Sequence, residues 1–306
     1  MPPLHTVRLP ASGPEDVAVD GSGHVFTGTA DGRILRVDTA GGDVTAVAAT
    51  GGRPLGIEVL DDALLVCDAD RGLLRVDPAE GRVDVLCRDA GGVPLTFCNN
   101  AAVAADGTIF FTDSSQRFSL EHWRADIVEH SGTGRLIRLS PDGDATVILD
   151  GLQFANGVAL AADESYVAVA ETGSYRVQQV WLSGDRAGTT GVLVDNLPGF
   201  PDNMATGSDG LIWIALASRR NPLLDWLHKQ PPVIRRVLWT VPEQLQPGPQ
   251  RTAWVLAVNA AGEVVHDVQR TDPDFHFATG VREADGRVYM GSLLTSTLAW
   301  FDLETP

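Results

Sequence analysis

The amino-acid sequence predicts an all-β fold, a six-bladed β-propeller of four-stranded antiparallel blades with a short helical insertion in blade five. Three observations predict it. One segment pattern recurs six times along the 306 residues: an apolar strand, a tight turn, a second apolar strand and a glycine-led third strand. Apolar and polar residues alternate with period two inside these segments, which is typical of strands with one buried face. The turns are Asp-Gly, Asp-Asp and similar pairs, as antiparallel hairpins require.

The six copies of this pattern define one blade each and begin near residues 15, 56, 99, 156, 202 and 279. The intervals between them are 41, 43, 57, 46 and 77 residues. A four-stranded blade takes roughly 40–50 residues, so the two longer intervals carry insertions. Six such blades would close into a ring that leaves only short strand edges. We therefore expect a single domain, residues 1–306, although the length alone suggests about two.

Two further segments bear on this ring. Residues 5–10, HTVRLP, have strand character and would close the ring as the outer strand of blade six; a disordered tail is the alternative. Residues 223–245, in the insertion of blade five, carry apolar residues at helical spacing that are interrupted by Pro231 and Pro232. This spacing predicts a short helix across one mouth of the ring, with a long surface loop as the alternative.

Composition bounds the partners. The formal net charge of −17 argues against nucleic acid and against an anionic membrane surface, because both need clustered Lys and Arg. We expect a small-molecule substrate, and the oligomeric state is left open. The start of the chain has no signal-peptide pattern, so a soluble, cytoplasmic protein is expected. Three cysteines do not form a disulfide framework, although a Cys87–Cys98 bridge stays open.

The residues that open the six copies are expected to point toward the propeller axis on one face. They are Glu15, Gly56, Asn99, Asn156, Asp202 and Thr279. Two carboxylates and two amides on one axis are the oxygen donors that Ca²⁺ or another hard divalent cation prefers, whereas zinc prefers His and Cys. The alternative is that Asn and Asp stand there as ordinary turn residues.

Five segments resemble the strictosidine synthase-like family, within a superfamily that includes gluconolactonases, paraoxonases and diisopropylfluorophosphatase. They are GPEDVAVD, GRPLGIEV, FTDSSQRF, FANGVALAADESYVAVAETGSYRV and LPGFPDNM. The resemblance implies a six-bladed propeller with calcium or another divalent ion on its axis. By motif, the ligands of that ion fall on Glu15, Asn99, Asn156 and Asp202. The sequence departs from the family's condensing enzyme, because Thr279 stands where that enzyme has its catalytic glutamate, and Glu283 lies four residues on.

These features predict a metal-dependent hydrolase of a small lactone or ester, with a phosphotriester as a further candidate. Asp202 would be a metal ligand and either general base or nucleophile, and His276 is the alternative base. A binding propeller with a structural ion is a second hypothesis. A condensing lyase is a third, disfavoured by Thr279.

Several residues beside these motifs are predicted to bind substrate or shape the pocket. Ser114 lacks a nucleophile elbow and is interpreted as a channel residue that makes hydrogen bonds. Trp226 and Trp239 would cover an apolar substrate. The substrate-binding candidates are Asn100, Asp113, Arg117, Asn203 and Trp226.

Overall fold

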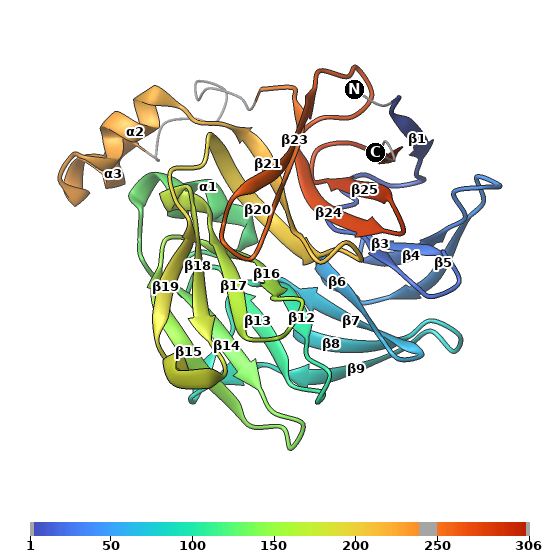
Figure 1. The fold of residues 1–306 in the computed structure, drawn as a ribbon, viewed down its shortest axis with the longest axis horizontal. Coiled ribbons are helices and arrows are strands. Elements are labelled where there is room, and N and C mark those ends of the chain that lie inside the picture. The colour runs from blue at the N-terminus through green and yellow to red at the C-terminus, as the bar shows by residue number, and fades with distance from the viewer. Residues whose placement is uncertain (1–2, 239–249, 304–306) are drawn as a thin grey trace.

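The computed structural model describes residues 3–238 and 250–303, and these form a ring of six four-stranded antiparallel sheets (Figure 1). The innermost strands of the six sheets contact their neighbours around the ring; they are β2, β6, β12, β16, β20 and β24, whose bounds follow below. The predicted six-bladed propeller is confirmed.

The first three blades follow one another in chain order. Blade one consists of β2 (Ala18–Val19), β3 (Val25–Gly28), β4 (Arg33–Val37) and β5 (Val44–Ala49). Blade two consists of β6 (Pro54–Leu60), β7 (Ala63–Asp68), β8 (Gly72–Asp77) and β9 (Arg82–Cys87). Blade three consists of β12 (Cys98–Val103), β13 (Ile109–Asp113), β14 (Gly134–Leu139) and β15 (Ala145–Leu152). A small hairpin, β10 (Asp89–Ala90) and β11 (Val93–Pro94), joins blades two and three.

The other three blades include the ring closure. Blade four consists of β16 (Ala155–Leu160), β17 (Tyr166–Glu171), β18 (Arg176–Trp181) and β19 (Thr190–Val194). Blade five consists of β20 (Gly199–Thr206), β21 (Ile212–Arg219), β22 (Ala253–Val258) and β23 (Val264–Arg270). Blade six consists of β24 (Ala278–Ala284), β25 (Arg287–Ser292), β26 (Thr297–Asp302) and the N-terminal β1 (His5–Arg8).

Strand β1 closes the ring as the sequence predicted. It pairs antiparallel with β26, and His5 lies opposite Trp300 with their rings stacked 5.7 Å apart. The first and last strands of the chain therefore share one blade. This arrangement ties the first and last strands of the described chain together, so the ring closes within blade six.

The α-helices of the described residues lie in the two insertions, and two short 3-10 helices, η2 (Thr172–Ser174) and η3 (Gly184–Arg186), lie in blade four. Blade five contributes α2 (Pro222–His228) and α3 (Pro232–Leu238), so the predicted helical insertion is confirmed, together with its break before Pro232. Asn221 caps α2 by accepting a hydrogen bond from the Leu223 backbone amide at 2.9 Å. Residues 239–249, with the end of the predicted helical segment and Trp239, lie outside the described residues.

Blade three contributes helices that the sequence analysis did not predict, η1 (Leu120–His122) and α1 (Trp123–Glu129). Helix α1 packs against both α2 and α3, on the same side of the ring (Figure 1). Among the described residues no helix is both long and apolar enough to cross a lipid bilayer.

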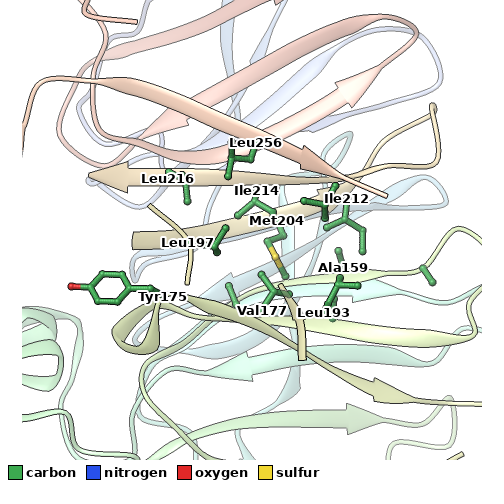
Figure 2. Packing of buried hydrophobic residues seen from close by; sticks show 14 of the residues in the cluster. Ala159, Tyr175, Val177, Leu193, Leu197, Met204, Ile212, Ile214, Leu216 and Leu256 are labelled. Atoms are coloured by element: carbon green, nitrogen blue, oxygen red, sulfur yellow. The ribbon is translucent and has the colours of Figure 1, made fainter. Parts of the chain in front are cut away.

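Hydrophobic clusters lie between adjacent blades and hold the ring together. Figure 2 shows one of them, in which Val177 and Leu193 of blade four pack against Met204, Ile214 and Leu256 of blade five. Each inner strand thus buries apolar side chains against the next blade rather than around one central core. The three cysteines are buried as free thiols, so no Cys87–Cys98 bridge forms.

Candidate metal centre

Five of the six inner strands have an interruption in their pairing at the level where the sequence analysis expected metal ligands. The antiparallel register shifts between Cys98 and Ala101, between Ala155 and Val158, and between Pro201 and Met204. Similar shifts interrupt β6 between residues 54 and 57 and β24 between residues 278 and 280. Such bulges leave residues unpaired and redirect their side chains, and they recur near functional sites.

The first residue of each bulge lines a pocket on the propeller axis, together with Glu15, which lies just before β2. These residues are Leu55, Asn99, Asn156, Asp202 and Thr279. Together with Glu15 they form what we call the pocket floor. The predicted phase of blade two was wrong by one residue, because Leu55 and not Gly56 faces the pocket. Gly56 instead meets the next blade, where an added Cβ would come within 2.6 Å of the Asn100 Cα.

The second residues of the bulges form another layer next to the first. Going round the ring from blade one, this layer alternates polar residues with glycine: Asp16, Gly56, Asn100, Gly157, Asn203 and Gly280. A Cβ on Gly157 or Gly280 would lie within 2.4 Å or 2.5 Å of the next blade's backbone. The glycines thus let adjacent inner strands approach closely, and the polar side chains support the pocket floor.

Each of the two floor asparagines, Asn99 and Asn156, has a side-chain oxygen without a hydrogen-bond partner among the described residues. The Asn99 amide donates to the Ser114 Oγ at 2.8 Å, and the Asn156 amide donates to the Thr172 Oγ1 at 3.1 Å. Both side chains are buried, and neither Oδ1 has a hydrogen-bond partner among the described residues. A buried carbonyl oxygen without a partner costs about 1–3 kcal/mol unless a ligand satisfies it. These two oxygens therefore indicate a site for a cation or another electron-pair acceptor.

Burial also disfavours the ionised form of the two floor carboxyls, Glu15 and Asp202. Burial, followed by the nearby Asp202 carboxylate, raises the pKa of Glu15 to about 8. Burial likewise raises the pKa of Asp202, to about 8 even though hydrogen bonds from Asn156 and the Asn203 backbone act in the opposite direction. Both groups would ionise more readily beside a cation.

The donor set fits a hard divalent cation. Two carboxylates would neutralise its charge, and two amide oxygens would add neutral ligands of the kind that Ca²⁺ prefers. In the described part of the chain, no three His, Cys, Asp or Glu side chains form a group that could hold a metal ion, so a cation on the floor would need the amide oxygens as ligands. The predicted ligand positions Glu15, Asn99, Asn156 and Asp202 all lie together on the pocket floor.

The pocket above this floor has a volume of about 750 Å³. Its walls come from the inner ends of the blades and from both insertions, and they are largely apolar. Helix α1 contributes Trp123 and Ile127, and α2 contributes Leu224 and Trp226. Such an apolar pocket with a few convergent polar groups is the usual setting of a small-molecule site.

Of the five predicted substrate-binding residues, Trp226 alone is on the pocket wall, where it is 53% exposed. Asn100 and Asn203 belong to the second layer, where Asn100 donates to Asp16 at 3.0 Å. Asp113 is buried in an ion pair with Arg135 at 2.6 Å and also accepts the Phe97 backbone amide. It therefore stabilises the blade-three turn rather than the pocket.

Arg117 pairs with the buried Glu129 at the end of α1, at 3.1 Å, so it anchors that helix and does not line the pocket. His276 is likewise absent from the described pocket wall, which its neighbour Phe277, at φ 58°, does line. Burial lowers the pKa of His276, followed by the effect of Arg251. Its catalytic role stays a prediction, since His276 does not line the described pocket.

Thr279 occupies the blade-six position of the floor, and its hydroxyl donates to the Glu15 backbone carbonyl at 2.7 Å. Glu283 lies away from the floor, at the hairpin between β24 and β25. There its carboxylate accepts hydrogen bonds from the Ser208 hydroxyl at 2.9 Å and the Gly286 backbone amide at 2.7 Å. Within residues 3–238 and 250–303, blade six thus presents no glutamate to the pocket.

The fold defines a class, the six-bladed β-propellers, and solved structures share its shape. Solved structures of similar shape include a gluconolactonase from Xanthomonas campestris, with a TM-score of 0.72 and 18% identity over 98% of this chain and 89% of that one. They also include regucalcin from Agrobacterium tumefaciens, described as a calcium-binding protein, with a TM-score of 0.68 and 14% identity over 97% of this chain and 94% of that one.

Sequence comparison gives the family within that class: the chain belongs to the strictosidine synthase-like family. The strictosidine synthase family model matches residues 99–185, and the strictosidine synthase-like N-terminal model matches residues 3–37. Adipocyte plasma membrane-associated protein of Salmo salar is 36% identical over 95% of this chain and 76% of its own length. Strictosidine synthase-like protein 10 of Arabidopsis thaliana is 34% identical over 96% of this chain and 86% of its own length.

Proposed function

We propose that the protein is a metal-dependent hydrolase of a lactone or other carboxylic ester, with Ca²⁺ or another divalent cation at the pocket floor. One observation carries the proposal. Two buried asparagine oxygens, which have no partner among the described residues, and two buried carboxyls converge on the floor of a largely apolar pocket. The gluconolactonase and regucalcin among the structural neighbours support a hydrolase and a divalent ion of this kind.

Each floor residue has a defined part in this proposal. Glu15, Asp202 and the Oδ1 atoms of Asn99 and Asn156 would hold the cation. When bound, a cation of this kind polarises a substrate carbonyl and stabilises negative charge on its oxygen. Ser114 and Thr172 accept hydrogen bonds from the amide nitrogens of Asn99 and Asn156, and this leaves the two amide oxygens free to bind the cation. The ligands are thereby oriented before substrate arrives.

Asp202 is the residue proposed to act on the substrate itself. It is the most exposed of the four ligands, at 9%, and it lines the pocket. Its carboxylate would take a proton from an attacking water or attack the carbonyl carbon directly. The apolar walls would exclude bulk water from the reacting groups, which strengthens the electrostatic interactions on the floor.

A strictosidine synthase-type condensation is not favoured. That chemistry needs a carboxylate at the blade-six position, and Thr279 stands there with its hydroxyl bonded to the Glu15 backbone. Glu283 cannot substitute, since its carboxylate is occupied at the hairpin turn by Ser208 and Gly286.

A hydrolysis panel tests the proposal. Chelator-stripped protein would be assayed on aliphatic lactones, aryl esters and a phosphotriester, before and after addition of Ca²⁺, Mn²⁺, Mg²⁺ or Zn²⁺. We expect turnover of an ester or lactone that one cation restores and that the Asp202→Asn variant loses by at least about a hundredfold. Asp62→Asn, at a hairpin turn with its side chain 92% exposed, is the matched control. Tight cation binding without turnover on any substrate would instead favour a structural ion.

A further inference from the structure

The pocket is much larger and more apolar than hydrolysis of a small, hydrophilic lactone requires. We propose that its substrate is an ester or lactone with an extended apolar acyl or aryl body, and not a polyhydroxylated sugar lactone. This inference rests on the proposed hydrolase function and adds the substrate class to it. A volume of about 750 Å³ lies in the upper part of the range for pockets that enclose drug-sized ligands, about 300–1,000 Å³.

The walls supply apolar contacts from three directions. The ring itself contributes four phenylalanines, and two of them, Phe97 and Phe154, pack edge-to-face with centroids 5.4 Å apart. The blade-three insertion adds Leu120, Trp123, Ile127 and Val128. The blade-five helix α2 adds Leu223, Leu224, Trp226 and Leu227. Both insertions, which lengthen the basic blade repeat, thus contribute apolar surface to the same cavity.

The polar groups of the pocket are poorly placed to bind sugar hydroxyls. On the floor, the hydroxyls of Thr172 and Thr279 already donate to backbone carbonyls, each at 2.7 Å. Among the wall residues, Arg219 pairs with Gln269, and Arg220 donates to Asn196 at 2.5 Å while lying 4.0 Å over the Tyr175 ring. A substrate hydroxyl against the phenylalanines and leucines of the wall would be buried without a partner, and this disfavours such a ligand.

The rim of the pocket leaves apolar side chains uncovered. Leu223 is 60% exposed and Trp226 is 53% exposed, although both line the cavity. Because α2 is held to α1 by the contact of His228 with the Ile127 carbonyl at 2.8 Å, these two side chains are presented at a fixed edge. A substrate long enough to reach from the floor to this edge would cover them, and a short ester would not.

The substrate class is tested with p-nitrophenyl esters from acetate through butyrate and octanoate to dodecanoate, alongside gluconolactone. We expect kcat/KM to rise about two- to fourfold for each added methylene until the pocket is filled, as expected for burial of apolar carbon. Gluconolactone should be turned over far more slowly than the octanoate ester. A flat or falling series, or a preference for gluconolactone, would overturn the inference while leaving the hydrolase function intact.

Two further measurements separate the substrate class from the function. In metal-stripped protein, displacement of an apolar fluorescent probe by dodecanoate or by gluconate reports the pocket's preference without any turnover.

The Trp226→Ala variant should lower the dodecanoate-to-acetate ratio of kcat/KM at least tenfold, whereas Val233→Ala, on α3 and 69% exposed outside the pocket wall, should leave the ratio unchanged. A uniform loss on all esters would mean that Trp226 acts on folding alone, and this would count against the inference. Absence of hydrolysis on every ester, with dodecanoate still displacing the probe, would refute the hydrolase and retain the apolar preference.

Discussion

The side-chain amide of Asn203 donates to both carboxylate oxygens of Glu15, each at 3.0 Å, across 188 residues of sequence. This contact joins blade five to the start of blade one at the pocket floor. It also links the two layers of the inner ring, because Asn203 belongs to the second layer and Glu15 to the first. Glu15 is therefore oriented by a residue that makes no contact with the pocket.

Removal of this contact should weaken cation binding without unfolding the ring. In the Asn203→Ala variant the Glu15 carboxylate loses its anchor, and we expect the cation affinity to fall about 10–100-fold, as for other residues that orient metal ligands. Calorimetric titration of chelator-stripped protein measures it. Asn259→Ala, which removes an amide from an exposed hairpin turn of blade five, should keep the affinity of the unmodified protein. Equal losses in both variants would contradict the proposed role of Asn203.

The hydroxyl of Ser114 should matter for the same reason at another ligand. It accepts the Asn99 amide at 2.8 Å, so Ser114→Ala leaves that amide free to turn its nitrogen toward the floor. We expect the affinity for Ca²⁺ to fall by about tenfold with little change in melting temperature. Ser22→Ala, in an exposed turn of blade one, is the control. An unchanged affinity would show that the orientation of Asn99 does not depend on this hydroxyl.

Neutralising one floor carboxyl should stabilise the metal-free protein. Burial and the neighbouring Asp202 raise the pKa of Glu15, so its ionised form is unfavourable at pH 8. Glu15→Gln should raise the stability of chelator-treated protein by about 1–2 kcal/mol at that pH and abolish the stabilisation by added Ca²⁺. Thermal melts with chelator and with Ca²⁺ provide the comparison. A variant that is less stable in chelator would contradict like-charge strain on the floor.

The stacked pair of His130 and His228 should make the contact between α1 and α2 sensitive to acid. Their rings lie 4.2 Å apart, and burial lowers the pKa of both, that of His130 to about 4. The charge of Arg235 contributes to the lowering of both pKa values, while Glu171 for His130 and Asp225 for His228 act in the opposite direction.

Because both pKa values are depressed on folding, the stability that the pair contributes is present above pH about 6.5 and is lost as the pH falls toward 4. We expect hydrogen exchange in α1 and α2 to accelerate over this window, ahead of the strands. His130→Asn, which suits the left-handed backbone at φ 55°, should remove much of the acid dependence. Exchange that is independent of pH between 7 and 4 would contradict this account.

Much of the fold and the floor could be predicted from the sequence because both follow the blade repeat. The common phase of Glu15, Asn99, Asn156 and Asp202 identified four residues that the structure brings together. The same reasoning failed at Gly56, because the bulge that turns Leu55 inward leaves no sign in an apolar strand.

Other features could not be predicted because they depend on contacts between distant segments. Asp113 was predicted to bind substrate because the sequence does not show its ion pair with Arg135, which lies 22 residues further along the chain. Helix α1 has only seven residues, too short to be stable alone, and it is held by packing against α2 and α3. Ser114 was predicted to make hydrogen bonds in the channel, and its bond to Asn99 confirms this.

The central claim is that the four floor residues hold a cation on which hydrolysis depends. The most direct test is calorimetric titration of Ca²⁺ into chelator-stripped protein, with ester turnover measured on the same samples. We predict one Ca²⁺ per chain, with activity rising in proportion to site occupancy, and loss of both in the Glu15→Gln, Asp202→Asn double variant. Full activity in chelator, or no binding of Ca²⁺, Mn²⁺ or Mg²⁺ by the unmodified protein, would contradict the claim.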